Sequence, residues 1–167
     1  VTEFDEALKT LVDDMFETCE AAPGVGLAAP QVGVGKRIFV WMYEDQEDAP
    51  ARGVAINPEL WIEPIEPGLP GEEDLEGCLS FPGERFELSR SNRALLRAQD
   101  INGEPFEIET SGWFARIMQH EFDHLNGLLY VDRPVHPESR GAQKAERKNG
   151  WGKPGLSWMP GEDDLEG

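Results

Sequence analysis

The segment His120-Glu-Phe-Asp-His124 constrains this chain more than any other stretch of its 167 residues. On a helix, side chains four positions apart lie on one face, one turn above the other. His120 and His124 can therefore bind one metal ion together, with Glu121 beside them to exchange protons with water at the metal. Asp123 points to another side of the helix, which favours a supporting role for its carboxylate. The segment predicts a metal-dependent hydrolase.

Apolar residues surround this motif and indicate that the helix is buried. The helix is expected from about Ser111 or Gly112 to Asn126, and Gly127 ends it. The apolar positions are Phe114, Ile117, Met118, Phe122 and Leu125. Imidazole and carboxylate groups are costly to bury unless they are paired or bind a metal. The alternative, a surface helix with histidine and acid in solvent, is therefore less favoured.

A catalytic metal site of this kind needs a third protein ligand and an open position for water or substrate. One protease pattern places a third histidine six residues after the second, but Tyr130 occupies that position. His136, between two prolines, is a weak alternative. Downstream glutamates are another route, although they lie in charged, tail-like sequence: Glu138, Glu146 and Glu162. Cys78 is the best-placed candidate, as a thiolate.

The two cysteines have very different surroundings. Cys78 lies in Glu76-Gly-Cys-Leu-Ser80, where Gly77 lets the backbone approach a metal or substrate. On its own Cys78 would be interpreted as a buried core thiol, but beside an HExxH motif without another ligand the metal interpretation is favoured. Cys19 falls on an apolar helical stripe and is expected to be a small buried residue. No disulfide is expected in a domain of this size without a secretion signal.

The Gly-rich segment from Gly24 to Gly33 does not match a phosphate-binding loop. Such a loop requires GxxxxGK followed by Ser or Thr, whereas Gly35-Lys36 is followed by Arg37. The segment is better suited to line a site. Gln31 offers an uncharged hydrogen-bond donor that suits an oxyanion, and the alternative is an amide that braces the loop.

The order of helix, strands and helix predicts an α+β protein. An amphipathic helix opens the chain, with Thr2 as its N-cap and Pro23-Gly24 as its end. Its apolar positions are Phe4, Leu8, Leu11, Val12, Met15, Phe16 and Cys19. Strands are expected over 37–43, 54–56, 60–62, 86–88, 94–98, 105–108 and 128–131. We expect short antiparallel strands packed around a central metal-binding HExxH helix. One catalytic domain should span 1–167, with a charged, Gly- and Trp-rich extension over 134–167.

The charge of the chain argues against some classes of binding partner but leaves an anionic partner possible at one segment. The formal net charge of -18 argues against bulk attraction to nucleic acid or to anionic membranes. No apolar run is long enough to span a bilayer, and no secretion signal opens the chain, so a cytoplasmic location is expected. A basic island interrupts the acidic sequence: Arg140, Lys144, Arg147, Lys148 and Lys153. This island is either a solvated helix end or a contact to something anionic.

Three motifs together resemble those of the peptide deformylase family. They are GVGLAAPQ at 24–31, EGCLS at 76–80 and QHEFDH at 119–124, in the family's order and at compatible spacing. The resemblance extends to about Arg133, and the tail resembles that of actinobacterial members. It implies removal of the N-formyl group from the N-terminal methionine of newly made polypeptides, with release of formate. It also implies one divalent metal ion, with Fe(II) as the native metal and Zn or Ni as substitutes.

The resemblance assigns roles residue by residue. It implies that Cys78, His120 and His124 are the metal ligands and that Glu121 is the general acid and base. Gln31 and the backbone N–H of Leu79 would stabilise the oxyanion. The methionine pocket would be lined by Val25, Trp113, Arg116 and Ile117. Other substrate contacts would come from Gly24, Gly26, Gly77, Arg85 and the stretch around Glu72.

Two further expectations follow from the same resemblance. Family chains normally begin earlier, so a short strand segment is expected before Val1. The basic segment 140–153 could contact the ribosome, because ribosomal RNA is anionic. Two competing interpretations remain. Another metallohydrolase, such as a peptidase, would need a third ligand other than Cys78. A non-enzymatic binding relative would lack a ligand or Glu121, and all of these residues are present.

Overall fold

The computed structural model describes residues 1–45, 49–133, 139–163 and 165. The chain forms two compact units, which are described separately. The first comprises 1–66 and 90–128, and the second comprises 67–89 and 129–167. The expectation of one catalytic domain over 1–167 stays a prediction.

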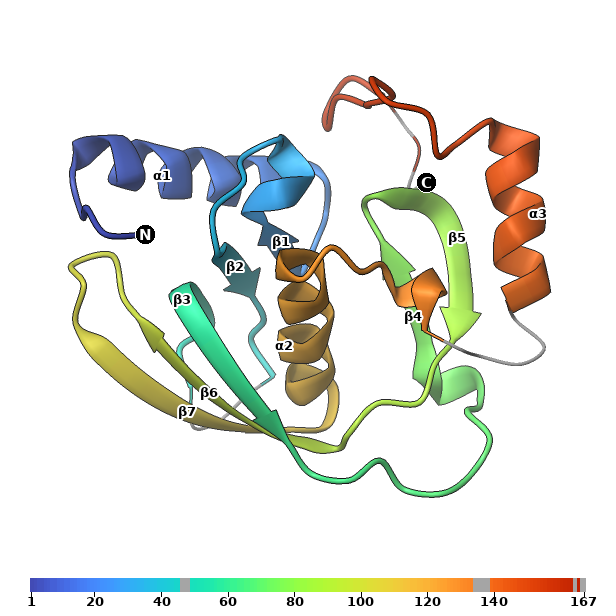
Figure 1. Ribbon diagram of the computed structural model, residues 1–167, viewed down its shortest axis with the longest axis horizontal. Helices are drawn as coiled ribbons and strands as arrows, with labels where there is room; N and C mark the ends of the chain where they lie inside the picture. Colours follow the sequence, from blue (N-terminus) through green and yellow to red (C-terminus); the bar gives the residue numbers. More distant parts are fainter. Residues whose placement is uncertain (46–48, 134–138, 164, 166–167) are drawn as a thin grey trace. The chain divides into compact units, whose positions relative to one another are not determined.

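An antiparallel five-stranded sheet forms the frame of the first unit (Figure 1), in the order β1-β2-β3-β6-β7. The strands are β1 (Gly26–Ala28), β2 (Ile38–Met42), β3 (Arg52–Ile62), β6 (Arg93–Gln99) and β7 (Pro105–Ser111). The first four residues of β2 are all buried, which explains why this strand reads as a continuous apolar run. A turn at Asn102-Gly103 joins β6 to β7, and Gly103 adopts a positive φ of 82° there.

Strand β3 is longer than the sequence predicts. Two short strands were expected over 54–56 and 60–62, with a break at the intervening Asn57-Pro58, but one strand runs through all of these residues. The pairing of β3 with β6 shifts between Ile56 and Glu59, so the dipeptide forms a bulge rather than a break. Asn57 takes a positive φ of 52°, and its amide donates to Gln99 Oε1 at 2.8 Å. The prediction of a break was wrong because a bulge accommodates the proline inside the strand.

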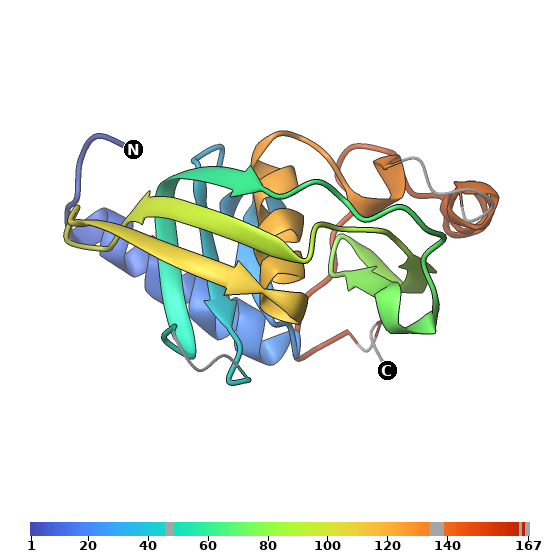
Figure 2. The same cartoon turned by 90° about the horizontal axis from the view of Figure 1, so that it is seen from below.

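Helix α1 (Glu6–Ala21) packs against β1 and β2. Figure 2 shows it behind the strands of the sheet. Its buried side chains are Leu8, Val12, Met15, Phe16 and Cys19. Asp5 is the N-cap and accepts the N–H of Leu8 at 2.9 Å, so the expectation of Thr2 at this position was wrong. The backbone at Asp5 takes the extended conformation that an N-cap requires, and the helix begins at the next residue, Glu6.

The second unit contains the hairpin of β4 (Leu75–Cys78) and β5 (Phe81–Glu87), together with helix α3 (Ser139–Asn149). An aromatic cluster forms its core, in which Phe81 contacts Phe86, Tyr130 and Trp151. The strand expected over 128–131 is instead a 3₁₀ turn, Tyr130–Asp132. Asp132 accepts the N–H of Leu129 at 2.7 Å, a local bond that competes with an extended chain. A short hydrophobic run therefore gave the wrong element.

The α+β class is confirmed by antiparallel strands and three α-helices among the described residues. In the same part of the chain, no helix is long and apolar enough to cross a membrane.

Candidate metal centre

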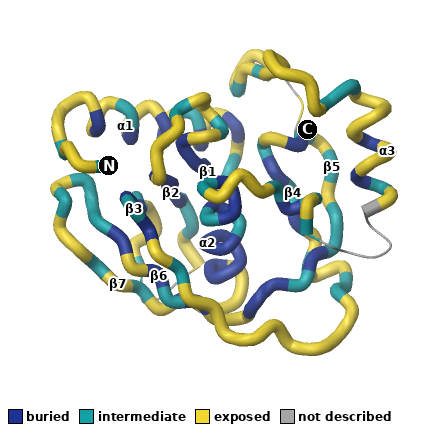
Figure 3. Tube along the Cα trace, in the orientation of Figure 1, coloured by how far each residue is buried: buried dark blue, intermediate teal, exposed yellow. Residues whose placement is uncertain are grey.

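Helix α2 (Gly112–Leu125) carries the HExxH motif and is largely buried, as Figure 3 shows. It packs against β1, β2, β3, β6 and β7 of the first unit. Its end is fixed by backbone bonds, because Gly127 N–H donates to the carbonyl of His124 and Leu128 N–H to that of Asp123. Gly127 has the positive φ of 74° that such a helix end uses. The helix therefore presents His120 and His124 from a rigid frame.

The two histidines lie one turn apart on α2, with ring centroids separated by 4.9 Å. The ring planes are inclined at 77°, and His124 is buried while His120 is half-buried. Two imidazoles in this arrangement can direct nitrogen atoms toward one point.

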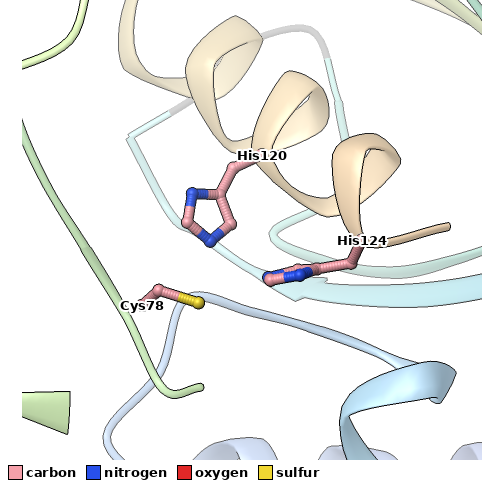
Figure 4. A group of neighbouring side chains, drawn as sticks. All are labelled: Cys78, His120 and His124. Carbon is pink, nitrogen blue, oxygen red and sulfur yellow. The ribbon is translucent and has the colours of Figure 1, made fainter. Parts of the chain in front are cut away.

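Cys78 is the last residue of β4 and is buried. One ligand atom from each of Cys78, His120 and His124 lies within 4.8 Å of the other two (Figure 4). A thiolate and two imidazoles are ligands that suit zinc or iron, so this donor set fits a divalent transition metal. The structure thus contains a group of side chains able to form a metal site.

The other third-ligand candidates have different settings. Tyr130, at the position of a third histidine, is buried, and its hydroxyl donates to the carbonyl of Glu84 at 3.0 Å. Glu146 and Glu162 are exposed to solvent. His136 and Glu138 lie outside the described residues. Neither Cys19 nor Cys78 is in a disulfide.

Glu121 is only 4% exposed, and Gly26 packs directly against it. A Cβ atom on Gly26 would lie 2.8 Å from Cδ of Glu121 and 2.9 Å from its Cγ, closer than side chains tolerate. Cys19 of α1 is fully buried nearby. Burial, and secondarily the negative charge of Glu121, raises the pKa of the Cys19 thiol to about 12. The expectation that Cys19 is a small buried residue is confirmed.

Two polar side chains of α2, Gln119 and Asp123, fix the helix to the segment before β6. Gln119 accepts the N–H of Ser91 at 3.1 Å and donates to its carbonyl at 2.8 Å. Asp123 forms a buried ion pair with Arg90 at 2.6 Å. The supporting role suggested for Asp123 is therefore visible in the structure. Gln119 is the first residue of QHEFDH, but nothing in the sequence near Arg90 marks it as the partner.

Gln31 lies in a 3₁₀ turn, Ala29–Val32, that follows β1. Its Oε1 accepts the N–H of Ala28 at 2.8 Å, which fixes the orientation of the amide and directs its donor group away from Ala28. Leu79 follows β4 directly, and its carbonyl accepts the indole N–H of Trp158 at 2.8 Å.

The expected substrate-binding residues of the first unit combine exposed apolar and buried positions. Val25 is 44% exposed and Trp113 is 39% exposed, whereas Arg116 and Ile117 are buried. The Arg116 guanidinium lies 5.3 Å from the centroid of the Trp113 ring. Gly24 forms two hydrogen bonds with Cys19. The N–H of Gly24 donates to the carbonyl of Cys19 at 2.9 Å, and the thiol of Cys19 donates to the carbonyl of Gly24 at 3.3 Å.

In the second unit, Gly77 of β4 pairs with Arg85 of β5, and a Cβ at Gly77 would lie 3.4 Å from the Arg85 side chain. Arg85 is exposed, as is Glu72 in the 3₁₀ turn before β4.

A buried helix with HExxH, a cysteine at ligand distance and an antiparallel α+β frame define a metallohydrolase-like protein. The comparisons narrow this class. Residues 1–140 match the family described as polypeptide deformylase. The chain belongs to this family, so the resemblance inferred from the three motifs is confirmed.

Curated relatives and solved structures agree with this assignment. A peptide deformylase of Mycolicibacterium smegmatis is 49% identical over 158 residues, covering 93% of this chain and 80% of the relative. One from Tropheryma whipplei (strain TW08/27) is 47% identical, covering 97% of this chain and 86% of the relative. The crystal structure of the Thermus thermophilus peptide deformylase has a TM-score of 0.76 at 37% identity, covering 89% of this chain and 83% of that one. The structure of the Synechococcus elongatus peptide deformylase in complex with actinonin has a TM-score of 0.75 at 37% identity, covering 90% of this chain and 78% of that one.

Proposed function

We propose that this chain is a peptide deformylase that hydrolyses the formamide of N-formyl-methionyl peptides and releases formate. The observation that carries the proposal is the grouping of Cys78, His120 and His124 within 4.8 Å in a chain of the deformylase family. Formylated N-termini belong to newly made polypeptides, so the substrate would be the nascent chain and the location the cytoplasm.

Cys78, His120 and His124 would hold one divalent metal ion, with α2 as the metal-binding helix. The resemblance to the family is the reason to propose Fe(II) as the native metal and Zn or Ni as substitutes, and a thiolate with two imidazoles is compatible with each of them. When bound, the metal would supply Lewis acidity and lower the pKa of a coordinated water.

Glu121 would act as the general base and then as the general acid. Its carboxylate would take a proton from the attacking water, and the oxygen of that water would bond to the formyl carbon. Glu121 would then deliver the proton to the leaving amine as the C–N bond breaks. Gln31 Nε2 and the backbone N–H of Leu79 would donate to the oxyanion of the tetrahedral intermediate. The amide orientation imposed by Ala28 supports this role for Gln31.

Substrate selection would rest on three features: a methionine pocket, contacts to the peptide backbone and the small size of the formyl group. Val25, Trp113, Arg116 and Ile117 would line the methionine pocket, where Trp113 and Val25 supply exposed apolar surface. Gly24, Gly26, Gly77, Arg85 and the stretch around Glu72 would contact or support the peptide backbone. The small formyl hydrogen would fit where larger acyl groups clash, so N-acetyl peptides should be poor substrates.

The decisive assay measures formate release from an N-formyl-methionyl peptide by protein loaded anaerobically with Fe(II). Glu121→Gln should lower kcat about a hundredfold or more, since it removes proton transfer. Glu109→Gln, an exposed carboxylate on β7, should leave the rate unchanged. Absence of formate from the intact protein would overturn the proposal, and cleavage of unformylated peptides would favour a peptidase.

A contact with the ribosome is a second proposal, carried by α3. Arg140, Lys144, Arg147 and Lys148 are exposed on this helix, while Ala142 and Ala145 face the core of the second unit. The positive charges are therefore available to an anionic surface such as ribosomal RNA. Co-sedimentation with ribosomes should be lost when Arg147 and Lys148 are both changed to Glu, and retention in the double variant would contradict it.

A further inference from the structure

The C-terminal tail of the second unit contacts the turn that follows Cys78. Trp158 donates its indole N–H to the carbonyl of Leu79 at 2.8 Å. Trp151 packs on Phe81 with a centroid distance of 4.5 Å. The carbonyl of Leu165 lies 3.0 Å from the point where a Cβ would stand on Gly83. The tail therefore contacts the β4–β5 hairpin at three points, of which Leu79 lies in the connection between the two strands, although the family match ends at residue 140.

This connection lies outside the regular strand pairing. Gly77 pairs with Arg85, but the next residue, Cys78, pairs with Phe81 because the register shifts between them. Leu79 and Ser80 then form the turn. Ladder bonds cannot orient the peptide groups of these two residues, so other contacts must do so.

Trp158 stands out from its neighbours in the tail. Leu156 and Met159 are well exposed, at 59% and 58%, whereas Trp158 is half-buried. A local turn supports it, since Asp163 accepts the N–H of Met159 at 2.7 Å and donates its own N–H to the Met159 carbonyl at 2.9 Å. The tail is thus locally structured where it reaches Leu79.

We propose that Trp158 is a positioning residue, whose indole N–H holds the Leu79 carbonyl and thereby orients the Leu79 N–H and the Cys78 thiolate. The carbonyl and the N–H of Leu79 are separated only by its Cα, so holding one restricts the rotation that would turn the other. This inference rests on the proposed function, which assigns Cys78 to the metal and Leu79 N–H to the oxyanion. It gives the tail a role in the rate of the reaction rather than in substrate binding.

The test compares Trp158→Phe with Met159→Ala in the full chain. The phenylalanine keeps an aromatic ring but removes the donor, and the exposed Met159 controls for a change in the same turn. Trp158→Phe should lower kcat about threefold to tenfold, the effect of one misplaced hydrogen-bond donor, with KM and metal content unchanged. In Co(II)-loaded protein, the thiolate-to-cobalt charge-transfer band should shift in Trp158→Phe but not in Met159→Ala.

Two results would overturn the positioning role of Trp158. Equal kcat and an unchanged cobalt spectrum in Trp158→Phe would overturn the inference. A loss of activity in proportion to lost metal or lost folded protein would also overturn it, since the role would then be structural only. If the unaltered protein releases no formate, the proposed function fails, and the cobalt spectrum alone still decides whether Trp158 positions the Cys78 thiolate.

Discussion

At the scale of single residues, the absence of a side chain at Gly26 matters as much as the groups proposed to be catalytic. Gly26 contacts Glu121 so closely that even one methyl group would overlap the carboxylate-bearing end of that side chain. The motif GVGLAAPQ therefore does more than supply a flexible loop. Its second glycine leaves the volume that Glu121 occupies.

Gly26→Ala should lower kcat about tenfold or more, because Glu121 would have to move from the position proposed for its proton transfer. Shortening the acid relieves the overlap, so the same change in a Glu121→Asp background should cost much less. Steady-state rates for the four proteins of this double-mutant cycle check the coupling, with metal content measured for each. Equal effects of Gly26→Ala in both backgrounds would show that Gly26 acts through the substrate instead.

Cys19 gives the stability of the protein a pH dependence at alkaline pH. Its pKa is raised from 9.0 to about 12, first by burial and then by the charge of Glu121, so above pH 9 the unfolded chain loses a proton that the native chain keeps. The stabilisation is therefore complete below pH 9 and is lost as the pH rises toward 12.

Urea denaturation at several pH values checks this expectation. The free energy of unfolding should fall with pH more steeply in the natural chain than in Cys19→Ala, by up to about 1.4 kcal/mol per pH unit between 9 and 12. Because Cys78, the lysines and the tyrosines are the same in both proteins, the difference isolates Cys19. If the free energy of unfolding fell equally with pH in the two proteins, the expectation would be wrong.

At the scale of elements, the sequence predicted the features that depend on residues close to one another in the chain. The ends of α2 agree with the sequence to within a residue, because the apolar spacing and Gly127 act within the helix. The bulge of β3 at Asn57-Pro58 and the pairing of β4 with β5 depend on neighbouring strands, so the sequence could not show them. The HExxH spacing predicted the histidine pair for the same local reason. Contacts between segments that are distant in the sequence, such as the contact of Gly26 with Glu121, could not be predicted from any sequence pattern.

The attachment of α2 to the segment before β6 should be among the costliest features to disturb. Asp123→Ala leaves Arg90 charged and buried, which should destabilise the protein by about 3–5 kcal/mol. Glu109→Ala is the matched control, because it removes the carboxylate of an exposed pair with Arg93 and should cost less than about 1 kcal/mol. Denaturant midpoints measure both.

Replacing both charges, with Arg90→Met and Asp123→Leu together, should recover part of the stability lost in Asp123→Ala, since no buried charge is then left without its partner. A double variant as unstable as the single one would show that the pair acts through its geometry and not through its charge.

At the scale of the whole molecule, the net charge and a bound metal ion would have opposite effects on the stability of the folded chain. A formal net charge of -18 makes the folded chain repel itself, and the basic face of α3 is a local exception. A divalent cation held by Cys78, His120 and His124 would oppose this repulsion and join residues that are far apart in the sequence. Because the unfolded chain cannot hold these three ligands together, metal binding should stabilise the native state.

Removal of the metal should therefore lower the thermal midpoint. A metal present at about a thousand times its dissociation constant stabilises by about 4 kcal/mol, which corresponds to a shift of roughly 10 °C for a chain of this size. Adding Zn(II) or Ni(II) back should restore the midpoint. Cys78→Ala should contain less than stoichiometric metal and show little shift with a chelator, while Cys19→Ala, the other thiol, should behave as the natural chain. If Cys78→Ala kept both its metal and its chelator-induced shift, Cys78 would not be the third ligand, and the case for a deformylase centre would have to rest on another side chain.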